Sequence, residues 1–339
     1  MAVTIKDVAQ RCGMSISTVS KVFNGYSDIS EDTRNQVRRA AQEIGYHPNA
    51  LARALKTNRS YNIGVLFVDE SNSGLTHPFF AAVLNAFKQE AEARGYDITF
   101  INHNNGASAM TYLEHCTYRN VDGVCMACIN FYSEEVRMLA GSGIPCVSID
   151  HRFEGQPSVY SDNAAGIRLL VERAYALGHR RIVYLHGQRN SEVTEIRTRS
   201  FAESMRALGL PLDSRSLVES RYDDSAFVME QLRALLSAPD RPTCILLPDD
   251  ISYVGAQSAA MSLGLRMPDD ISFAGFDGIR LTQTLRPYLT TVRQDSVELG
   301  RQAALRLIEA VEHPGAAPLE TTLIPVTLLE GETLGKNPQ

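Results

Sequence analysis

The sequence predicts an α/β protein in which a small, all-helical head precedes a much larger two-lobed body with parallel sheets. Residues 1–48 carry apolar side chains at helical spacing between capping residues, whereas from Asn62 onward short apolar runs alternate with helical patterns. Continuous apolar strands joined by helices are typical of parallel sheets that are covered on both faces. A chain of 339 residues is also long enough for two or three domains, each with a core.

The first part of the head predicts two short helices joined by a tight turn. Thr4 can cap the first helix, Gly13 can end it because glycine accepts a positive φ, and Ser15 is placed to cap the second. In the second helix Val19 and Val22 face inward, and the outward positions near its start are Ile16, Ser17, Ser20 and Lys21. This pattern indicates a helix-turn-helix, whose second helix enters the major groove of DNA. An ordinary helical hairpin is the alternative.

A third helix is predicted from Ser30, which can cap it, to Gly45, which can end it. With the residues that follow, the sequence strongly resembles the LacI/GalR family of bacterial transcription regulators. The matching strings are TIKDVAQRCGMSISTVSKVFN, ISEDTRNQVRRAAQEIGYHPNALARALK and ISFAGFDGIRLTQTLRPYLTTVRQD. The resemblance covers essentially the whole chain, and its N-terminal motifs are highly specific.

The resemblance implies a helix-turn-helix DNA-binding domain at residues 1–48, a hinge helix and linker at 49–60, and a periplasmic-binding-protein-like effector domain at 61–332. Three connections would cross between the two lobes of that domain. The expected lobes are residues 61–161 plus 296–321 and residues 162–295 plus 322–332. A helix over 297–311 is expected to return the chain to the first lobe before one last strand over 322–329.

The distribution of charge fits a nucleic-acid partner for the head alone. The net charge is −6, but residues 1–60 hold nine Lys or Arg against five Asp or Glu, and the remaining residues hold 24 against 34. A basic head on an acidic body predicts attraction to DNA phosphates at one end of the chain. The alternative is an ordinary solvated charged face.

Several other classes of protein are disfavoured. No apolar run approaches the roughly 20 residues that cross a bilayer, and the N-terminus has no apolar signal core, so we expect a cytoplasmic protein without membrane contact. Six cysteines form neither a disulfide framework nor a zinc set, and Cys125 and Cys128 should point to opposite faces of one strand. GxSxG, HExxH, P-loop and GxGxxG motifs are missing. We therefore expect no enzyme, metal or cofactor, and rank a glycosidase and an exported sugar receptor as weaker alternatives.

Polar residues follow several predicted strands, in the strings SIDHR (148–152), LPDD (247–250), FDG (276–278) and RQ (293–294). Ligands of open α/β sheets bind at the carboxyl ends of strands, so a cleft between the lobes is the expected pocket. Carboxylates and an arginine can bind vicinal hydroxyls, which suits a sugar or sugar derivative. Carried over from the family by motif, the effector contacts would be Phe79, Asp150, Arg197, Tyr222, Asp249, Asp277 and Gln294. The alternative for the aspartates is a helix cap, above all for Asp249 and Asp250.

The sequence departs from the family pattern at two places. Arg199-Ser200 replaces the usual Ala-Gly after the pocket arginine, and Asp249-Asp250 replaces the common Asn-Asp pair. Both departures are expected to bring charge near the cleft, which keeps a cationic or amino sugar among the candidate effectors.

The expected DNA contacts are Thr4, Ile16, Ser17, Ser20, Lys21, Asn24, Leu55 and Lys56. The hinge at 49–56 is too short for a stable isolated helix, so it should order only when two copies pack on DNA. The resemblance makes Leu55 a wedge in the minor groove of a pseudo-palindromic operator bound by a homodimer, with packing of Leu51 and Leu55 against the partner as the alternative. The architecture allows the effector either to release or to strengthen DNA binding.

Overall fold

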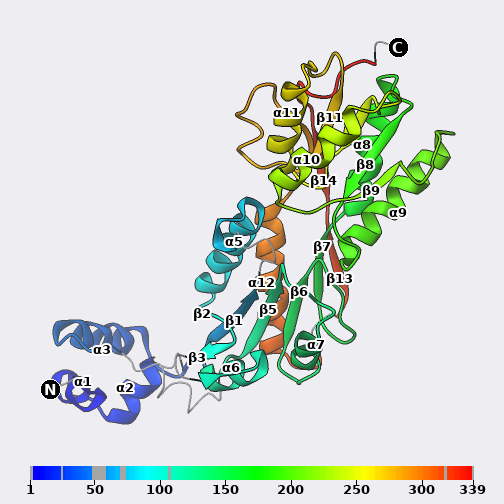
Figure 1. Cartoon of the computed structure of the whole chain (residues 1–339). Helices are drawn as coiled ribbons and strands as arrows, with labels where there is room; N and C mark the ends of the chain where they lie inside the picture. Colours follow the sequence, from blue (N-terminus) through cyan, green and yellow to red (C-terminus); the bar gives the residue numbers. More distant parts are fainter. Residues whose placement is uncertain are drawn as a thin grey trace. The chain divides into compact units, whose positions relative to one another are not determined.

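The computed structural model describes residues 3–23, 26–47, 59–68, 74–105, 108–316 and 319–337. The chain forms two compact units, Met1–Asn62 and Ile63–Gln339 (Figure 1). None of the helices in these ranges is both long and apolar enough to cross a bilayer.

The first unit is a three-helix bundle made of α1 (Ile5–Cys12), α2 (Ile16–Phe23) and α3 (Glu31–Glu43). Its small core is aliphatic, with Val8, Val19 and Val37 fully buried. The helices begin and end where the capping residues predict. Asp7 Oδ2 accepts hydrogen bonds of 2.7 Å from both the backbone N–H and the hydroxyl of Thr4, and Gly13 ends α1 at φ 67°.

The first lobe of the large unit is built on a six-stranded sheet in the order β13-β7-β6-β5-β1-β2. The helices α5 (Pro78–Ala93) and α12 (Ser296–Glu312) pack on one face, and α6 (Tyr112–Arg119) and α7 (Glu134–Ala140) on the other (Figure 1). The strands are β1 (Asn62–Phe67), β2 (Asp97–Phe100), β5 (Gly123–Ala127), β6 (Cys146–Ile149), β7 (Ser158–Ser161) and β13 (Thr321–Ile324). A 3-10 turn, η1 (Gly74–Thr76), precedes α5, and the short strands β3 (Asn104–Asn105) and β4 (Ser108–Ala109) form a separate hairpin.

The second lobe repeats the plan with the strand order β14-β12-β11-β10-β8-β9. One face is covered by α8 (Asn163–Ala176) and α9 (Glu192–Ala207), the other by α10 (Ser225–Leu236) and α11 (Ser252–Ser262). The strands are β8 (Ile182–His186), β9 (Leu217–Glu219), β10 (Cys244–Leu246), β11 (Ser272–Asp277), β12 (Thr290–Gln294) and β14 (Val326–Leu329). All neighbours are parallel except β12 and β14, so the carboxyl ends of β8, β10, β11 and β12 share one edge.

The chain passes three times between the two sheets: from β7 to α8, from β12 to α12, and from β13 to β14. The single last strand expected over 322–329 is wrong, and so is a lobe boundary at residue 321. Pro325 has no N–H for a ladder and divides this segment. The part before it, Thr321–Ile324, pairs with β7 in the first lobe, and the part after it pairs with β12 in the second.

The close approach of α12 to α5 depends on a residue without a side chain. A Cβ at Gly300 would lie 2.1 Å from the carbonyl oxygen of Val83 and 2.9 Å from the backbone nitrogen of Phe87. Since these are backbone atoms of α5, they cannot move without shifting the whole helix.

Gly300→Ala is therefore expected to lower the free energy of unfolding by about 1–3 kcal/mol through overpacking, as measured by urea denaturation. Gln302→Ala, on the same helix but only partly buried, is the control and should change it by less than about 0.5 kcal/mol. Equal stability of Gly300→Ala and the parent chain would contradict this account of the α5–α12 contact.

Candidate functional site

The outward face of α2 carries the residues that the sequence selected for reading DNA. Ile16 and Ser17 are exposed at the start of the helix, and Ser20 and Lys21 lie one turn further on, partly exposed. Val19 and Val22 point into the bundle core, so the four polar or exposed positions share the opposite face. Thr4 is also exposed, although its hydroxyl is bonded to Asp7. Asn24, Leu55 and Lys56 lie outside the described residues, as does most of the expected hinge.

Lys21 has a partner within its own unit. Its Nζ lies 2.5 Å from Oδ2 of Asp28, and this pairing raises the pKa of Lys21 above its usual value. Any anion that binds Lys21 must therefore compete with Asp28. Both side chains are about half exposed, so the pair is accessible to such a competitor.

In the large unit the polar residues after the strands gather at the carboxyl edges of both sheets. Asp150 follows β6 of the first lobe, while Asp249, Asp277 and Gln294 end or follow β10, β11 and β12 of the second. Arg197 projects from α9 and is buried among them, with 4 % of its surface exposed.

Arg197 is held by three segments of the second lobe. Its Nε donates to Oδ1 of Asn163 at 2.7 Å, one of its terminal nitrogens donates to the carbonyl of Pro248 at 3.0 Å, and its guanidinium carbon lies 3.6 Å from the ring centroid of Phe276. Asp150 and Asp277 are near enough to interact with its charge. The arginine therefore keeps part of its donor capacity for the protein itself.

Asp277 and Gln294 form a bonded pair. Nε2 of Gln294 donates to Oδ1 of Asp277 at 2.6 Å, which leaves Oε1 of the buried Gln294 without a hydrogen-bond partner. Burial, and next the charge of Asp250, raise the pKa of Asp277 well above its usual value.

The capping alternative describes Asp249 well. Its two oxygens accept from the backbone N–H of Ser252 and of Asp223, both at 2.7 Å, so it fixes the start of α11 and the loop before α10. Asp250 is fully buried and accepts from the hydroxyls of Thr282 and Thr291 and from the N–H of Ile279. Both carboxylates already have protein donors.

Asp150 differs from them in keeping an oxygen without a partner. Its backbone has the left-handed φ of 64°, and its buried Oδ1 has no hydrogen bond. Burial raises its pKa to about 6, although the charge of Arg197 acts in the opposite direction. A ligand that donates a hydrogen bond would complete this group.

The two aromatic residues chosen from the sequence have different surroundings. The hydroxyl of Tyr222 lies 2.9 Å from that of Thr194, and its ring occupies the space beside Gly187, where a Cβ would be 1.9 Å away. Tyr222 also interacts with the charge of Arg197, so it belongs to the cluster. Phe79 is buried in α5 with its ring against Phe80, and among the described residues neither a hydrogen bond nor a ring contact joins it to Arg197.

Arg199 does not behave as expected. It is exposed on α9 two residues after the buried Arg197, so the helix turns it away from the cluster, and the expectation that it charges the cleft is wrong. Ser200 is buried and its hydroxyl donates to the carbonyl of Ala164 at 2.7 Å, which ties α9 to α8.

Sequence reasoning missed Glu192, which connects the two lobes. It is in the first turn of α9, and its Oε2 accepts from the backbone N–H of Arg152 in the first lobe at 3.1 Å. The same oxygen lies 3.3 Å from Nδ1 of His151, whose ring stacks on Phe131 at 4.6 Å between centroids. Burial lowers the pKa of His151. His151 follows a predicted strand and could be noticed for that reason, but a glutamate at a helix start indicates only an ordinary favourable charge.

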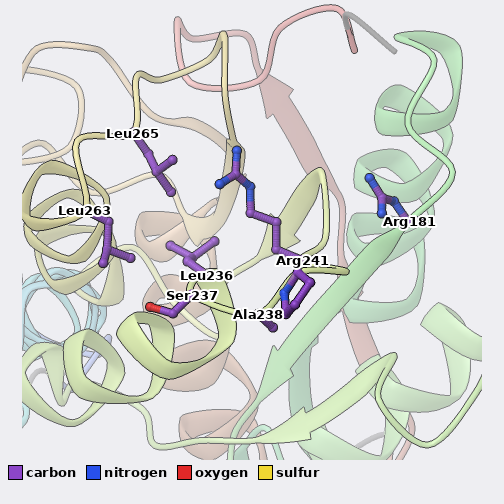
Figure 2. Close-up of a pocket in the computed structure, with 8 residues that line it drawn as sticks. Arg181, Leu236, Ser237, Ala238, Arg241, Leu263 and Leu265 are labelled. Atoms are coloured by element: carbon purple, nitrogen blue, oxygen red, sulfur yellow. The ribbon is translucent and has the colours of Figure 1, made fainter.

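Two cavities differ in their relation to this cluster. One of about 370 Å³ lies between the lobes and is lined by Asn130, Tyr132, Ser133, Arg189, Asn190 and Glu195. The other, of about 570 Å³, is at the opposite edge of the second sheet, where Arg181 and Arg241 precede β8 and β10 (Figure 2). Only the first lies at the carboxyl edges of the sheets, and its lining contains none of the residues grouped around Arg197.

The cysteines show no reactive arrangement in the described residues. The strand β5 ends at Ala127, so Cys125 is within it and Cys128 follows it at φ 53°, which corrects the expected placement of both on one strand. Burial raises the pKa of Cys116 and of Cys146 to about 12. Groups of three or more potential metal ligands are not found in the described ranges.

The chain is similar to bacterial repressors along its whole length. Residues 4–49 match the family described as bacterial regulatory proteins, lacI family, and residues 171–334 match a periplasmic binding protein-like domain. The HTH-type transcriptional repressor PurR of Erwinia tasmaniensis is 32% identical over 346 residues, which cover 99% of this chain and 98% of the relative. The ribose operon repressor of Haemophilus influenzae is 30% identical over 329 residues, covering 96% and 97%.

Among solved structures, the lac repressor dimer bound to operator and the anti-inducer ONPF superposes with a TM-score of 0.80. It is 26% identical, and the match covers 99% of this chain and 100% of that one.

The raised pKa of Asp150 leads to a pH-dependent prediction. The folded state binds the proton of this carboxyl more tightly than the unfolded state, so the stability that Asp150 contributes is present at acid pH and is lost as the pH rises from about 4 through 6. Asn cannot ionise and tolerates the left-handed conformation. Asp150→Asn should therefore raise the free energy of unfolding by ~1–3 kcal/mol at pH 8 and change it little at pH 4.

Urea denaturation at several pH values measures this difference. Asp97→Asn, at an exposed position of β2, is the matched control and should leave the pH profile unchanged. A destabilised Asp150→Asn variant at pH 8 would show that the carboxylate is favourably bound instead.

Proposed function

Because the chain belongs to the lacI family of bacterial regulatory proteins, we propose that it represses transcription as a homodimer on a pseudo-palindromic operator, under the control of a sugar or sugar derivative bound between its lobes. The family and the helix-turn-helix head make it a DNA-binding repressor with a ligand-binding domain. We propose three further properties: the symmetry of the operator, the class of effector, and the residues that contact DNA and effector.

The observation that carries the DNA-binding part is the outward face of α2. Ile16 can contact a thymine methyl, Ser17 can donate or accept a hydrogen bond, and Lys21 can donate to guanine O6 or N7. These side chains are exposed or partly exposed on one face, as base reading requires. Leu55, with Lys56 beside it, is proposed as the minor-groove wedge on the family resemblance alone.

Dimerisation is supported by the likeness to a repressor dimer bound to its operator. A two-fold dimer presents two recognition helices to two half-sites, which predicts a pseudo-palindrome.

The effector part is supported by the cluster around Arg197. It lies where the carboxyl edges of both sheets meet, and it combines carboxylates, an arginine and the ring of Tyr222. This combination suits a polyhydroxylated ligand, whose hydroxyls bind charged groups and whose apolar face packs on aromatic rings. The relatives have names as different as PurR and ribose operon repressor, so they do not indicate one common effector. The effector class proposed for this chain is therefore inferred from its own residues.

Selection from a random DNA pool tests the DNA-binding part. The purified chain should enrich a pseudo-palindrome, and Lys21→Ala should lose roughly 1–3 kcal/mol of operator affinity and relax the preference at one base pair in each half-site. Asp28→Asn should strengthen binding because it removes the competitor of DNA for Lys21. The control is Lys88→Ala, which breaks the exposed Lys88–Glu92 pair on α5. An unchanged preference in Lys21→Ala would exclude Lys21 from base reading.

Arg197→Ala tests the effector part. It should abolish the effect of ligands on operator binding while operator affinity stays nearly the same, because the head is a separate compact unit. Gel shifts with and without ligand measure the first property, and calorimetry measures ligand binding. Wild-type ligand affinity in this variant would place the effector elsewhere. Arg199→Ala, on the exposed side of the same helix, is the control.

A further inference from the structure

The polar cluster around Arg197, between the two lobes, is rich in carboxyl groups. Asp277 lies near Arg197 in the second lobe and Asp150 approaches it from the first, while Asp249 and Asp250 lie near Asp277. Glu192 adds a fifth carboxylate that is partly buried. Within the described ranges Arg197 is the one arginine or lysine that is buried. Carboxyl groups therefore outnumber basic groups at this place, and those that ionise need a partner.

The hydrogen-bond inventory separates structural carboxylates from those that face a ligand. Asp249 and Asp250 are satisfied by backbone and hydroxyl donors of the second lobe. Oδ1 of Asp150 and Oε1 of Gln294 have no partner, and Gln294 is 5 % exposed. Its Nε2 donates to Asp277, so the other end of the amide presents an oxygen. Both vacant positions accept hydrogen bonds, and their ligand must donate.

The basic groups at the rim do not offset this excess, because burial lowers the pKa of His151, whose Nδ1 lies 3.3 Å from Oε2 of Glu192, and so favours its neutral form. Arg189 lines the cavity between the lobes, but its side chain is exposed and its Nε lies 3.9 Å from Oε2 of Glu219. Arg152 is exposed and uses its backbone N–H on Glu192. Glu195 lines the same cavity, and Tyr132 presents a partly exposed ring there. An aromatic ring next to carboxylates favours a cation.

We propose that the effector carries a positively charged nitrogen, as in an amino sugar, and that this nitrogen binds between Asp150 of the first lobe and Glu192 of the second. The proposal rests on the proposed function, whose cleft it uses. The hydroxyls of the ligand would then bind Arg197, Asp277 and Oε1 of Gln294. A metal ion fits less well, because no group of three or more potential metal ligands occurs in the described part of the chain. A cation between residues of both lobes also neutralises the charge that would otherwise oppose their approach.

Matched ligand pairs test the charge requirement on the full-length chain. The probes are glucosamine, galactosamine and mannosamine, each compared by calorimetry with its neutral parent sugar and with its N-acetyl derivative. At least one amine should bind at least tenfold more tightly than both neutral counterparts. Neutral sugars that bind as tightly as their amines, or a panel in which no amine binds, would overturn the proposal.

Glu192→Gln tests the residue. Gln keeps an oxygen that can accept from the N–H of Arg152, so the contact between the lobes is retained while the charge is lost. The affinity for the amine should fall at least tenfold, and that for the neutral parent should not. Glu203→Gln, an exposed residue of the same helix, is the control and should leave both affinities unchanged. A Glu192→Gln variant with the affinity of the parent chain for the amine would overturn the assignment.

Operator binding separates this proposal from the one on which it depends. If a neutral sugar alone changes operator affinity, the repressor function stands and the amine proposal fails. If the chain selects no operator either without ligand or with any of the probe sugars present, the repressor function fails.

Discussion

The guanidinium of Arg197 is buried at the carboxyl edge of the second lobe, and three separate segments take their positions from it. Asn163 begins α8 directly after the chain crosses from the first lobe, Pro248 follows β10, and Phe276 is on β11. Removing a guanidinium from water is costly unless its donors and its charge are matched. The surrounding carboxylates supply the charge, so the acidic character of this region and the burial of the arginine depend on each other.

The same arrangement explains how a small ligand in the large unit could control the separate head. The lobes are joined by three chain crossings, and Glu192 of the second lobe binds the backbone of Arg152 in the first. A ligand held between residues of both lobes changes the free energy of one relative position of the lobes against another. Such a ligand changes DNA affinity only to the extent that its own affinities for the two arrangements of the lobes differ. This difference sets the size of any regulation.

Much of the fold could be predicted because local signals were strong. Capping residues and apolar spacing located the three head helices, and the alternation of strands and helices predicted the parallel sheets. The split of the last strand at Pro325 was missed because the apolar run continues across it, although proline removes a ladder hydrogen bond. The helices α6 and α7 and the strand β7 were not assigned, since they are short.

From the sequence, the site could be predicted only through polar residues that follow predicted strands and through the family motif. Arg197, Asp277 and Gln294 followed from the family motif, and the structure places them in one cluster. The sequence could not show which aspartates cap helices and which are available to a ligand. Both roles are typical of an aspartate that directly follows a strand. Asp249 has two backbone donors, whereas Asp150 has a vacant oxygen. Glu192 was missed because its partners are 40 residues away in the other lobe.

Amide hydrogen exchange with and without a bound effector tests the central claim, that the ligand binds between the lobes at this cluster. If the ligand binds there, adding it should slow exchange at residues 150–152 of the first lobe and at 192–197 and 277–279 of the second, together and with the same dependence on ligand concentration. Protection confined to one lobe, or found around Arg181 and Arg241 at the opposite edge of the second sheet, would contradict it.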